Sequence, residues 1–303
     1  MNARLDPPSG KLTLRQILAW SADRLDDAGV CFAQGTDNAH DEAVWLVLHA
    51  LGERPDAPVS APDRILSPDR IAGIVALLQA RVAGTPTAYL TGKTWFCGHE
   101  IFVDRRVIVP RSPIAELIDA RFQPWCDPNS VTRILDLCTG SGCIAIACAL
   151  AFPEARVDAC DISVDALDVA RVNVQAHRLE RRIRVLHSDL FTALRGEQYD
   201  LIVSNPPYVP STVVDMLPAE LQAEPRLALD GGEQGLDLVA RMLHQAGQYI
   251  HSQGMLVVEI GDFKEGLLQR FPDGRFVWPQ FARGGSGVFV MQASDLRFIL
   301  FPA

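Results

Sequence analysis

The sequence lacks any run of basic residues, and its hydrophobic stretches are too short to cross a membrane. Lys and Arg total 28 against 37 Asp and Glu, for a formal net charge of -9. Proteins that hold nucleic acid through its phosphates carry a basic surface instead, so we expect no stable nucleic-acid binding. The longest apolar run, residues 143–152, falls short of the roughly 20 residues of a membrane-spanning helix. The acidic charge suits a basic protein partner, or serves solubility alone.

Closely paired cysteines are also missing. The chain has 7 cysteines but no C-x-x-C pair, which argues against zinc, and we expect no bound metal. The odd count, with an N-terminus that has no apolar signal segment, favours the reducing cytoplasm. Hydrophobic residues make up 48% and charged residues 21% of the 303, as in ordinary globular proteins. That length suffices for one large α/β domain and a smaller one.

The first part of the chain has the apolar spacing of about three amphipathic helices. The expected caps and stops, in order, are Thr13 and Gly29, Asp37 and Gly52, and Ser67 and Gly84. Pro68 fits the first position of the third helix. We expect residues 1–88 to form a helical domain that recognises the substrate.

Residues 93–103 are rich in β-formers around Gly98 and predict a hairpin. We therefore expect a linker over residues 89–110 and a catalytic domain over residues 111–303. In that domain strands and helices alternate, which predicts a mostly parallel sheet with helices on both faces. Ser112 and Pro113 can start a helix that comes before the first strand of this sheet. The expected strands are 132–137, 156–160, 183–187, 201–204, 255–260, 276–279 and 288–291.

A glycine turn joins the first of these strands to a helix. Gly140-x-Gly142-x-x-Ala145 fits the dinucleotide fingerprint, and Asp161 ends the next strand about 20 residues later. Glycines let the backbone approach a ligand closely, and an acid at that distance accepts hydrogen bonds from ribose hydroxyls. Both NAD and S-adenosylmethionine need such an acid. The loop alone therefore indicates a nucleoside-like cofactor without choosing between them.

Two further acids bear on that choice. Asp136 stands just before the glycines, where it would repel a pyrophosphate but could meet the ammonium of the methionine part of S-adenosylmethionine. Asp189 and Leu190 follow the third strand, where a carboxylate can accept from the adenine amine and an apolar side chain can pack on the ring. Asp189 alone is equally compatible with a solvated loop acid. Asp136 favours S-adenosylmethionine.

Asn205-Pro206-Pro207-Tyr208 follows the fourth strand, at the edge where such sheets bind ligands. The prolines fix φ and remove two N–H donors, so the Pro206 carbonyl and the Asn205 amide oxygen are two acceptors for one NH2 group. Tyr208 can lie over a planar amide or ring. An amide nitrogen is a poor nucleophile, so positioning and preorganised acceptors would supply most of the rate. The pattern predicts methylation of a planar nitrogen.

With these residues the chain resembles the class I methyltransferases, which have a Rossmann-like, mostly parallel seven-stranded sheet. Within them it is similar to the HemK family of protein N5-glutamine methyltransferases. The motifs that carry the resemblance are Val109-Pro110-Arg111, residues 136–142, residues 205–208, and Glu224-Pro225-Arg226-x-Ala228-Leu229-x-Gly231-Gly232. The resemblance implies a helical N-terminal domain and a β-hairpin before the catalytic domain. It also implies a cofactor site of Asp136, Thr139, Gly140, Ser141, Gly142, Asp161, Asp189 and Leu190, and a glutamine site of Asn205, Pro206, Pro207 and Tyr208.

Two branches of that family differ after the hairpin. The branch that acts on peptide chain release factors reads Pro-Arg-Pro-Glu-Thr-Glu, whereas this chain has Pro110-Arg111-Ser112-Pro113. It also has Cys138 where that branch has glycine. Both features resemble the branch that methylates the third protein of the large ribosomal subunit, a basic target. The resemblance thus implies a large-subunit ribosomal protein as the partner.

Other functions remain open from the sequence alone. Exocyclic amines of DNA or RNA present the same planar NH2 group, although the acidic charge argues against them. A nicotinamide oxidoreductase would leave Asp136 and the Asn-Pro-Pro-Tyr turn without a role, and a binding protein without catalysis would not need the acceptors. Arg111 and Glu259 are left out of the predicted site, as a surface arginine near a proline turn and a strand end.

Overall fold

The structure is a computed structural model that describes residues 5–32, 35–55 and 58–300. It forms two compact units: one holds the chain up to Lys93 together with Pro218–Ala223, and the other holds the rest. By compactness the chain divides at Lys93, and nearly all of the hairpin belongs to the second unit. The expected domain boundaries at residues 88 and 110 remain a prediction. Across the described ranges, no helix has both the length and the apolar character to cross a bilayer.

The first unit is made of helices, the three longest of which are capped at their N-termini by short polar side chains. Its helices are α1 Leu14–Ala28, α2 Ala39–Ala50, α3 Pro68–Val82, α4 Thr87–Thr91 and α9 Ala219–Gln222. Thr13 caps α1 in a capping box with Gln16, as expected. The cap predicted for α2 is wrong: Asn38, not Asp37, accepts from the N–H of Asp41. Both residues can cap a helix, so composition could not separate them.

A buried charge cluster lies within the first unit. Arg81 is 1% exposed and pairs with Glu42 and, at 3.1 Å, with Glu220. Its guanidinium also donates to the Cys31 carbonyl at 2.8 Å, and Thr87 donates to Glu42 at 2.7 Å. Buried charges persist in proteins when they are paired and hydrogen-bonded. The cluster therefore fixes α9 to α2 and α3.

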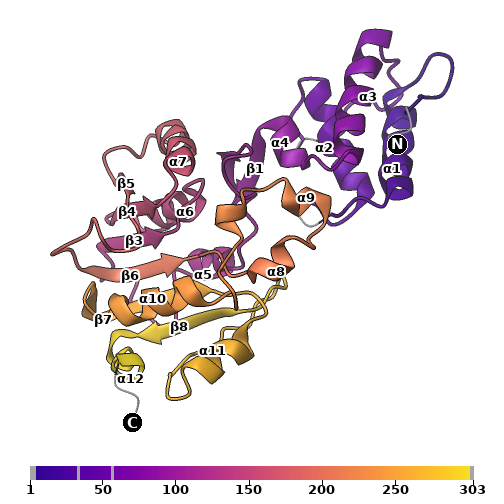
Figure 1. Cartoon of the computed structure of the whole chain (residues 1–303). Helices are drawn as coiled ribbons and strands as arrows, with labels where there is room; N and C mark the ends of the chain where they lie inside the picture. Colours follow the sequence, from indigo (N-terminus) through magenta and orange to yellow (C-terminus); the bar gives the residue numbers. More distant parts are fainter. Residues whose placement is uncertain (1–4, 33–34, 56–57, 301–303) are drawn as a thin grey trace. The chain divides into compact units, whose positions relative to one another are not determined.

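The second unit is an α/β domain with a hairpin before it (Figure 1). Its strands are β1 Lys93–Phe96, β2 His99–Phe102, β3 Arg133–Leu137, β4 Arg156–Asp161, β5 Ile183–His187, β6 Tyr199–Ser204, β7 Ile250–Glu259 and β8 Val288–Gln292. Its helices are α5 Ile114–Asp119, α6 Cys143–Ala151, α7 Val164–Ala176, α8 Ser211–Val214, η1 Arg226–Ala228, α10 Asp237–Ala246, α11 Lys264–Arg270, η2 Ala293–Asp295 and α12 Arg297–Leu300.

The central sheet has the strand order β5-β4-β3-β6-β7-β8. Neighbours are parallel except β7 and β8, which are antiparallel. The mostly parallel sheet is confirmed, but the seventh expected strand, residues 276–279, is reduced to one bridge between Val277 and Val290. Val277 makes both backbone hydrogen bonds of that bridge. Pro279 has no N–H to extend the ladder.

Alternation along the strands sends side chains to two covered faces. Leu135, Leu137 and Ile202 belong to a buried cluster with Val239 and Leu243 of α10. Helices α6 and α7 lie on the other side of the strands (Figure 1). A side chain at Gly142 would place its Cβ 3.3 Å from that of Ala170, so this glycine lets α6 begin close against α7. Helices on both faces leave the carboxyl ends of the strands open for a site.

Candidate methyl-transfer site

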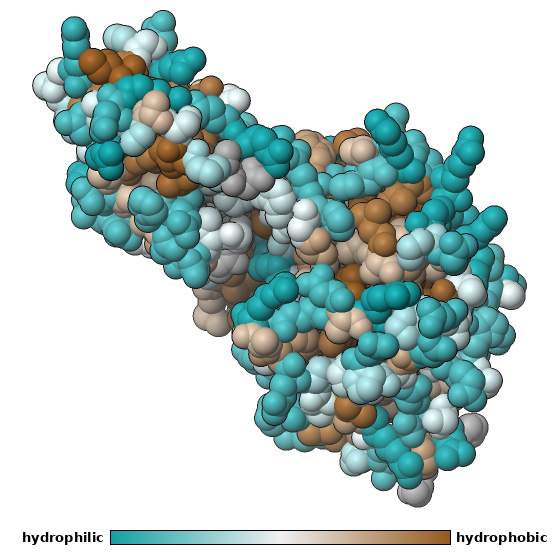
Figure 2. Space-filling view, turned by 180° about the vertical axis from the view of Figure 1, so that it is seen from behind, coloured by the Kyte–Doolittle hydropathy of each residue, from teal (hydrophilic) through white to brown (hydrophobic). Residues whose placement is uncertain are grey.

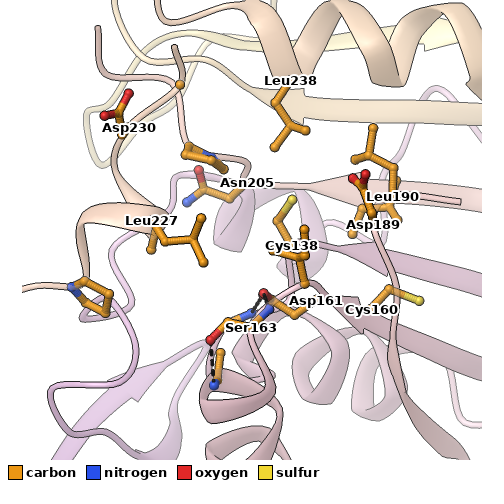
Figure 3. Close-up of a pocket in the computed structure, with 18 of the residues that line it drawn as sticks. Cys138, Cys160, Asp161, Ser163, Asp189, Leu190, Asn205, Leu227, Asp230 and Leu238 are labelled. Carbon is orange, nitrogen blue, oxygen red and sulfur yellow. Dashed lines mark hydrogen bonds between the residues drawn. The ribbon is translucent and has the colours of Figure 1, made fainter. Parts of the chain in front are cut away.

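A cavity of about 330 Å³ opens at the carboxyl ends of the parallel strands. Six of the predicted site residues line it: Gly140, Asp161, Asp189, Leu190, Asn205 and Pro207. Figure 3 shows Asp189 and Leu190 at one end, Asn205, Leu227 and Asp230 at the other, and Cys138 and Asp161 between them. The cavity is therefore elongated, with the predicted adenine residues and the predicted amide residue at opposite ends.

The glycine turn is held in shape by Asp136, at the end of β3. One carboxylate oxygen, Oδ2, accepts from the Thr139 hydroxyl and from the backbone N–H of Ala145. The other, Oδ1, is buried and has no hydrogen-bond partner among the described residues. Burial raises the pKa of Asp136 to about 7. A buried oxygen that lacks a donor is suited to a donor group of a bound molecule.

The remaining predicted members of the turn do not line the cavity. Thr139 and Ser141 are 5% and 3% exposed, and the Ser141 carbonyl accepts from the side chain of Asn173 at 2.9 Å. Asn173 also exchanges two hydrogen bonds with the backbone of Phe102, at the end of the hairpin. Thr139, Ser141 and Gly142 therefore shape the turn without lining the cavity. The side chain of Asn173 connects this turn to the end of the hairpin.

Asp161 lines the middle of the cavity and also organises the backbone around it. Its two oxygens accept from the N–H groups of Gly140 and Ser163, each at 2.9 Å. Burial raises the pKa of Asp161, and these backbone donors oppose that shift. Each carboxylate oxygen can accept more than one hydrogen bond, so the group can still receive a ribose hydroxyl.

Asp189 and Leu190 close one end of the cavity. Asp189 pairs with Arg241 at 2.7 Å, and both side chains line the cavity. Leu190 is 5% exposed and has a φ of 47°, in the left-handed region that non-glycine residues seldom occupy. Cys138, on the floor, has a φ of 60°. Strained backbone of this kind concentrates at ligand sites.

The Asn-Pro-Pro-Tyr turn begins where Ser204 donates to the carbonyl of Leu137 at 2.7 Å, tying the ends of β6 and β3 together. Asn205 and Pro207 line the cavity, whereas Pro206 and Tyr208 do not. Within the described part of the chain, no donor pairs with the Asn205 side chain or with the Pro206 carbonyl. Neither predicted acceptor is thus taken by another described group, and Asn205 is the one that lines the cavity.

Sequence reasoning missed a partly buried polar network behind this turn. Arg111 forms a two-pronged ion pair with Glu224, with N···O distances of 2.6 and 2.8 Å. Although burial disfavours the charge of Arg111, the bonds to Glu224 raise its pKa. Glu259 accepts from the hydroxyls of Tyr208 and Ser112. Neither Arg111 nor Glu259 lines the cavity, and the partners that place them behind the turn are too distant in sequence for spacing to show them.

Three glycines enclose the turn because side chains there would collide with it. A Cβ on Gly231 would lie 2.7 Å from the Pro207 carbonyl oxygen and from the Tyr208 Cα. On Gly235 it would lie 2.2 Å from the Tyr208 carbonyl oxygen, and on Gly261 it would lie 2.8 Å from the Tyr208 ring. Real Cβ atoms do not approach so closely. These contacts give the Gly231-Gly232 motif a physical role that its resemblance alone did not supply.

The chain segment of the last motif also lines the cavity directly. Leu227, Ala228 and Asp230 line it. The backbone N–H of Gly231 donates to the carbonyl of Val209 at 2.8 Å. On the other side, Arg106, Val107 and Ile108, which follow the hairpin, line it too. The sequence analysis gave these residues no role. They had no signal beyond their position next to the Val109-Pro110-Arg111 motif.

Comparison with known proteins gives the family. A model described as "Methyltransferase small domain" matches residues 125–232, and one described as "PrmC N-terminal domain" matches residues 16–92. A ribosomal protein uL3 glutamine methyltransferase of Bordetella pertussis is 46% identical over 94% of this chain and 96% of its own length. Proteins of the same name from Francisella tularensis and Burkholderia pseudomallei are 43% and 42% identical, over 94% and 95% of this chain and 91% and 97% of their own.

The chain belongs to the family of ribosomal protein uL3 glutamine methyltransferases. This confirms the resemblance to the HemK family and to its ribosomal branch. Among solved structures, the catalytic domain of hMettl16 in complex with MAT2A 3'UTR hairpin 6 superposes with a TM-score of 0.52. It is 14% identical, and the match covers 80% of this chain and 90% of that one. At that identity the likeness establishes the class I methyltransferase fold alone.

S-adenosylmethionine is the cofactor of this family, and the cavity fits it. The cavity is elongated, as this cofactor is, with an acid in the middle and an apolar residue at one end. Asp136 is fully buried and does not line the cavity, so its unpartnered oxygen fits a water that bridges to the ammonium group of the cofactor. Asp161 and the pair of Asp189 and Leu190 then lie in the order in which ribose and adenine follow one another.

Proposed function

We propose that this protein transfers a methyl group from S-adenosylmethionine to the side-chain amide nitrogen of a glutamine in the large-subunit ribosomal protein uL3. The observation that carries the proposal is the Asn-Pro-Pro-Tyr turn at one end of the cofactor-sized cavity. Its two acceptors have no partners among the described residues, and relatives at 42–46% identity carry this activity in their names.

In this proposal the turn positions the amide and stabilises the positive charge that develops on its nitrogen as it reacts. The Asn205 amide oxygen and the Pro206 carbonyl accept the two N–H hydrogens of the glutamine, which turns the nitrogen toward the cavity. As the nitrogen gains positive character its N–H groups become stronger donors, so these fixed acceptors stabilise the transition state more than the ground state. The sulfonium of the cofactor would supply the activated methyl group and leave as a neutral thioether, and the nitrogen would release one N–H proton to solvent once its bond to the methyl group has formed.

The other predicted site residues have supporting parts. We assign Asp161 to the ribose, Asp189 and Leu190 to the adenine, and Asp136 to the methionine ammonium. Thr139, Gly140, Ser141 and Gly142 shape the turn that these groups share. Pro207 lines the cavity beside Asn205, and we assign Tyr208, the next residue, to orienting the planar amide.

We further propose that the N-terminal helical domain, expected over residues 1–88, selects the protein substrate. The match of residues 16–92 to the N-terminal domain of a related enzyme supports this assignment. Ribosomal proteins are strongly basic, and a net charge of -9 favours such a partner by complementarity. A substrate of this kind places the reaction in the cytoplasm, where ribosomes are assembled.

The test is methyl transfer in vitro. Purified protein and methyl-labelled S-adenosylmethionine are incubated with total ribosomal protein from cells that lack this enzyme, and the labelled product is mapped by mass spectrometry. We expect label on one glutamine of uL3. Label on a release factor would keep the chemistry and overturn the substrate, and label only on DNA or RNA would overturn the protein substrate altogether. Omitting the ribosomal protein gives the background.

A further inference from the structure

A buried carboxylate lies behind the Asn-Pro-Pro-Tyr turn, and the proposed chemistry does not use it. Glu259 is 6% exposed at the carboxyl end of β7. It accepts a hydrogen bond from the Tyr208 hydroxyl at 2.9 Å and another from the Ser112 hydroxyl. Burial of a carboxylate is costly unless hydrogen bonds and charges compensate it. Its presence at this position therefore calls for a role that an apolar side chain could not fill.

Tyr208 is held at its ring and at its hydroxyl. Its ring lies so close to Gly261 that a Cβ there would be 2.8 Å from the ring, and it packs at a tilt against Phe263. Its hydroxyl proton is committed to Glu259, and burial together with that carboxylate raises the pKa of Tyr208. The phenol thus remains protonated and has one defined donor direction.

The second partner of Glu259 comes from the segment that leaves the hairpin. Ser112 donates to Glu259 Oε2 while Tyr208 donates to Oε1, so each carboxylate oxygen holds one chain segment. Ser112 is also the residue at which this chain departs from the Pro-Arg-Pro pattern, and a proline offers no hydroxyl for such a bond. Burial raises the pKa of Glu259, and the hydroxyl donors Ser112 and Tyr208, with the positive charge of Arg111, oppose that shift.

We propose that Glu259 is a positioning residue for methyl transfer: with Ser112 it fixes the hydroxyl of Tyr208, and thereby the ring that orients the glutamine amide. The inference rests on the proposed function. Hydrogen bonds to an ionised acceptor are shorter and about twice as strong as neutral ones, so a carboxylate restrains the ring more tightly than an amide or an apolar group would. A misplaced ring costs turnover without affecting the cofactor.

The test compares Glu259→Gln, Tyr208→Phe and the double variant in the uL3 methylation assay. We expect Glu259→Gln to lower kcat about tenfold or more, the scale of losing a hydrogen bond to a charged group. The Kd for S-adenosylmethionine, measured by calorimetry, should stay within about twofold. In the Tyr208→Phe background, Glu259→Gln should lower kcat by less than about twofold further, because the hydroxyl on which it acts is already gone.

Controls separate this inference from the proposed function. Glu265→Gln changes an exposed glutamate of α11 in the same way and should leave kcat unchanged. If the unaltered protein methylates no uL3, the proposed function fails. If it does so and Tyr208→Phe keeps the same kcat, or Glu259→Gln has its full effect in the Tyr208→Phe background, the relay from Glu259 through Tyr208 is wrong. Tyr208→Phe decides the matter even where Glu259→Gln does not fold.

Discussion

Asn205 differs from the acids around the cavity in what its side chain already binds. Asp161 accepts from two backbone N–H groups, and Asp189 pairs with Arg241. These carboxylates therefore stabilise the fold whether or not a ligand is bound. Asn205 lines the cavity with no hydrogen-bond partner among the described residues, so losing its amide should cost the protein little stability and the reaction a great deal.

We therefore expect Asn205→Ala to lower kcat about 100-fold or more, the scale of removing one preorganised hydrogen-bonding group. The thermal midpoint of unfolding should change by less than about 4 °C, because a polar side chain without internal partners contributes well under 1 kcal/mol to folding. Methyl transfer to uL3 gives kcat, and calorimetry gives the Kd for S-adenosylmethionine.

The matched control is Asn129→Ala, which removes an exposed asparagine from a turn before β3 and should leave kcat unchanged. The assignment of Asn205 to the substrate predicts that its variant binds the cofactor within about threefold of the normal Kd. Loss of cofactor binding would instead make Asn205 a cofactor ligand. An unchanged kcat would remove it from the mechanism.

At the scale of elements, the sequence predicted the strands that a local pattern marks and missed the contacts between residues that lie far apart in the chain. The strands β3, β4 and β5 were predicted to within a residue because their apolar runs end at polar turns. The strand expected at residues 276–279 is only a bridge, because Pro279 cannot donate. The bond from Ser112 to Glu259 spans 147 residues and that from Tyr208 spans 51. No periodicity or local spacing reports contacts of that length.

The short α4 was missed for a related reason. Thr87–Thr91 is too brief to show a helical period, and Thr87 instead joins the buried charge cluster by donating to Glu42. Glycines were read correctly where they end helices, as at Gly29. At Gly231 and Gly261 the need for glycine comes from the Asn-Pro-Pro-Tyr turn, and only the folded chain brings that turn close.

The enclosure of the turn by glycines yields a prediction at this scale. In Gly231→Ala the new Cβ would meet the Gly235 and Pro207 carbonyl oxygens at 2.5 and 2.7 Å, so the backbone of the turn must shift. A shift of about 1 Å in a group that positions a substrate costs on the order of 100-fold in rate. We expect kcat for uL3 methylation to fall by about that factor, while circular dichroism shows the same helix content.

Gly73→Ala is the matched control, because the same change inside α3 would meet nothing within 4 Å. There it should raise stability by up to about 1 kcal/mol, since alanine is the better helix former, and leave kcat alone. Gly231→Ala with full activity would show that the turn tolerates displacement. In that case the exact placement of its acceptors would not limit the reaction.

At the scale of the whole molecule, the net charge of -9 acts on the protein substrate, whereas the residues of the cavity act on the cofactor. On the face shown in Figure 2 hydrophilic side chains predominate, and apolar residues occur in separate patches. A long-range field of this sign attracts a basic protein and is screened by salt over a Debye length of about 10 Å at 0.1 M. The cofactor, by contrast, is bound through hydrogen bonds and packing inside the cavity, which act over short distances.

Salt should therefore separate the two binding steps. We expect kcat/KM for uL3 to fall about tenfold or more between 0.05 and 0.5 M NaCl, because electrostatic steering of association weakens steeply with ionic strength. The Kd for S-adenosylmethionine should change by less than about twofold over the same range, since buried or partly buried groups are screened much less. Initial rates at several uL3 concentrations, with saturating cofactor, measure the first quantity, and calorimetry measures the second. A kcat/KM that is flat across this range would mean that the acidic surface takes no part in capturing the substrate and that short-range contacts alone select it.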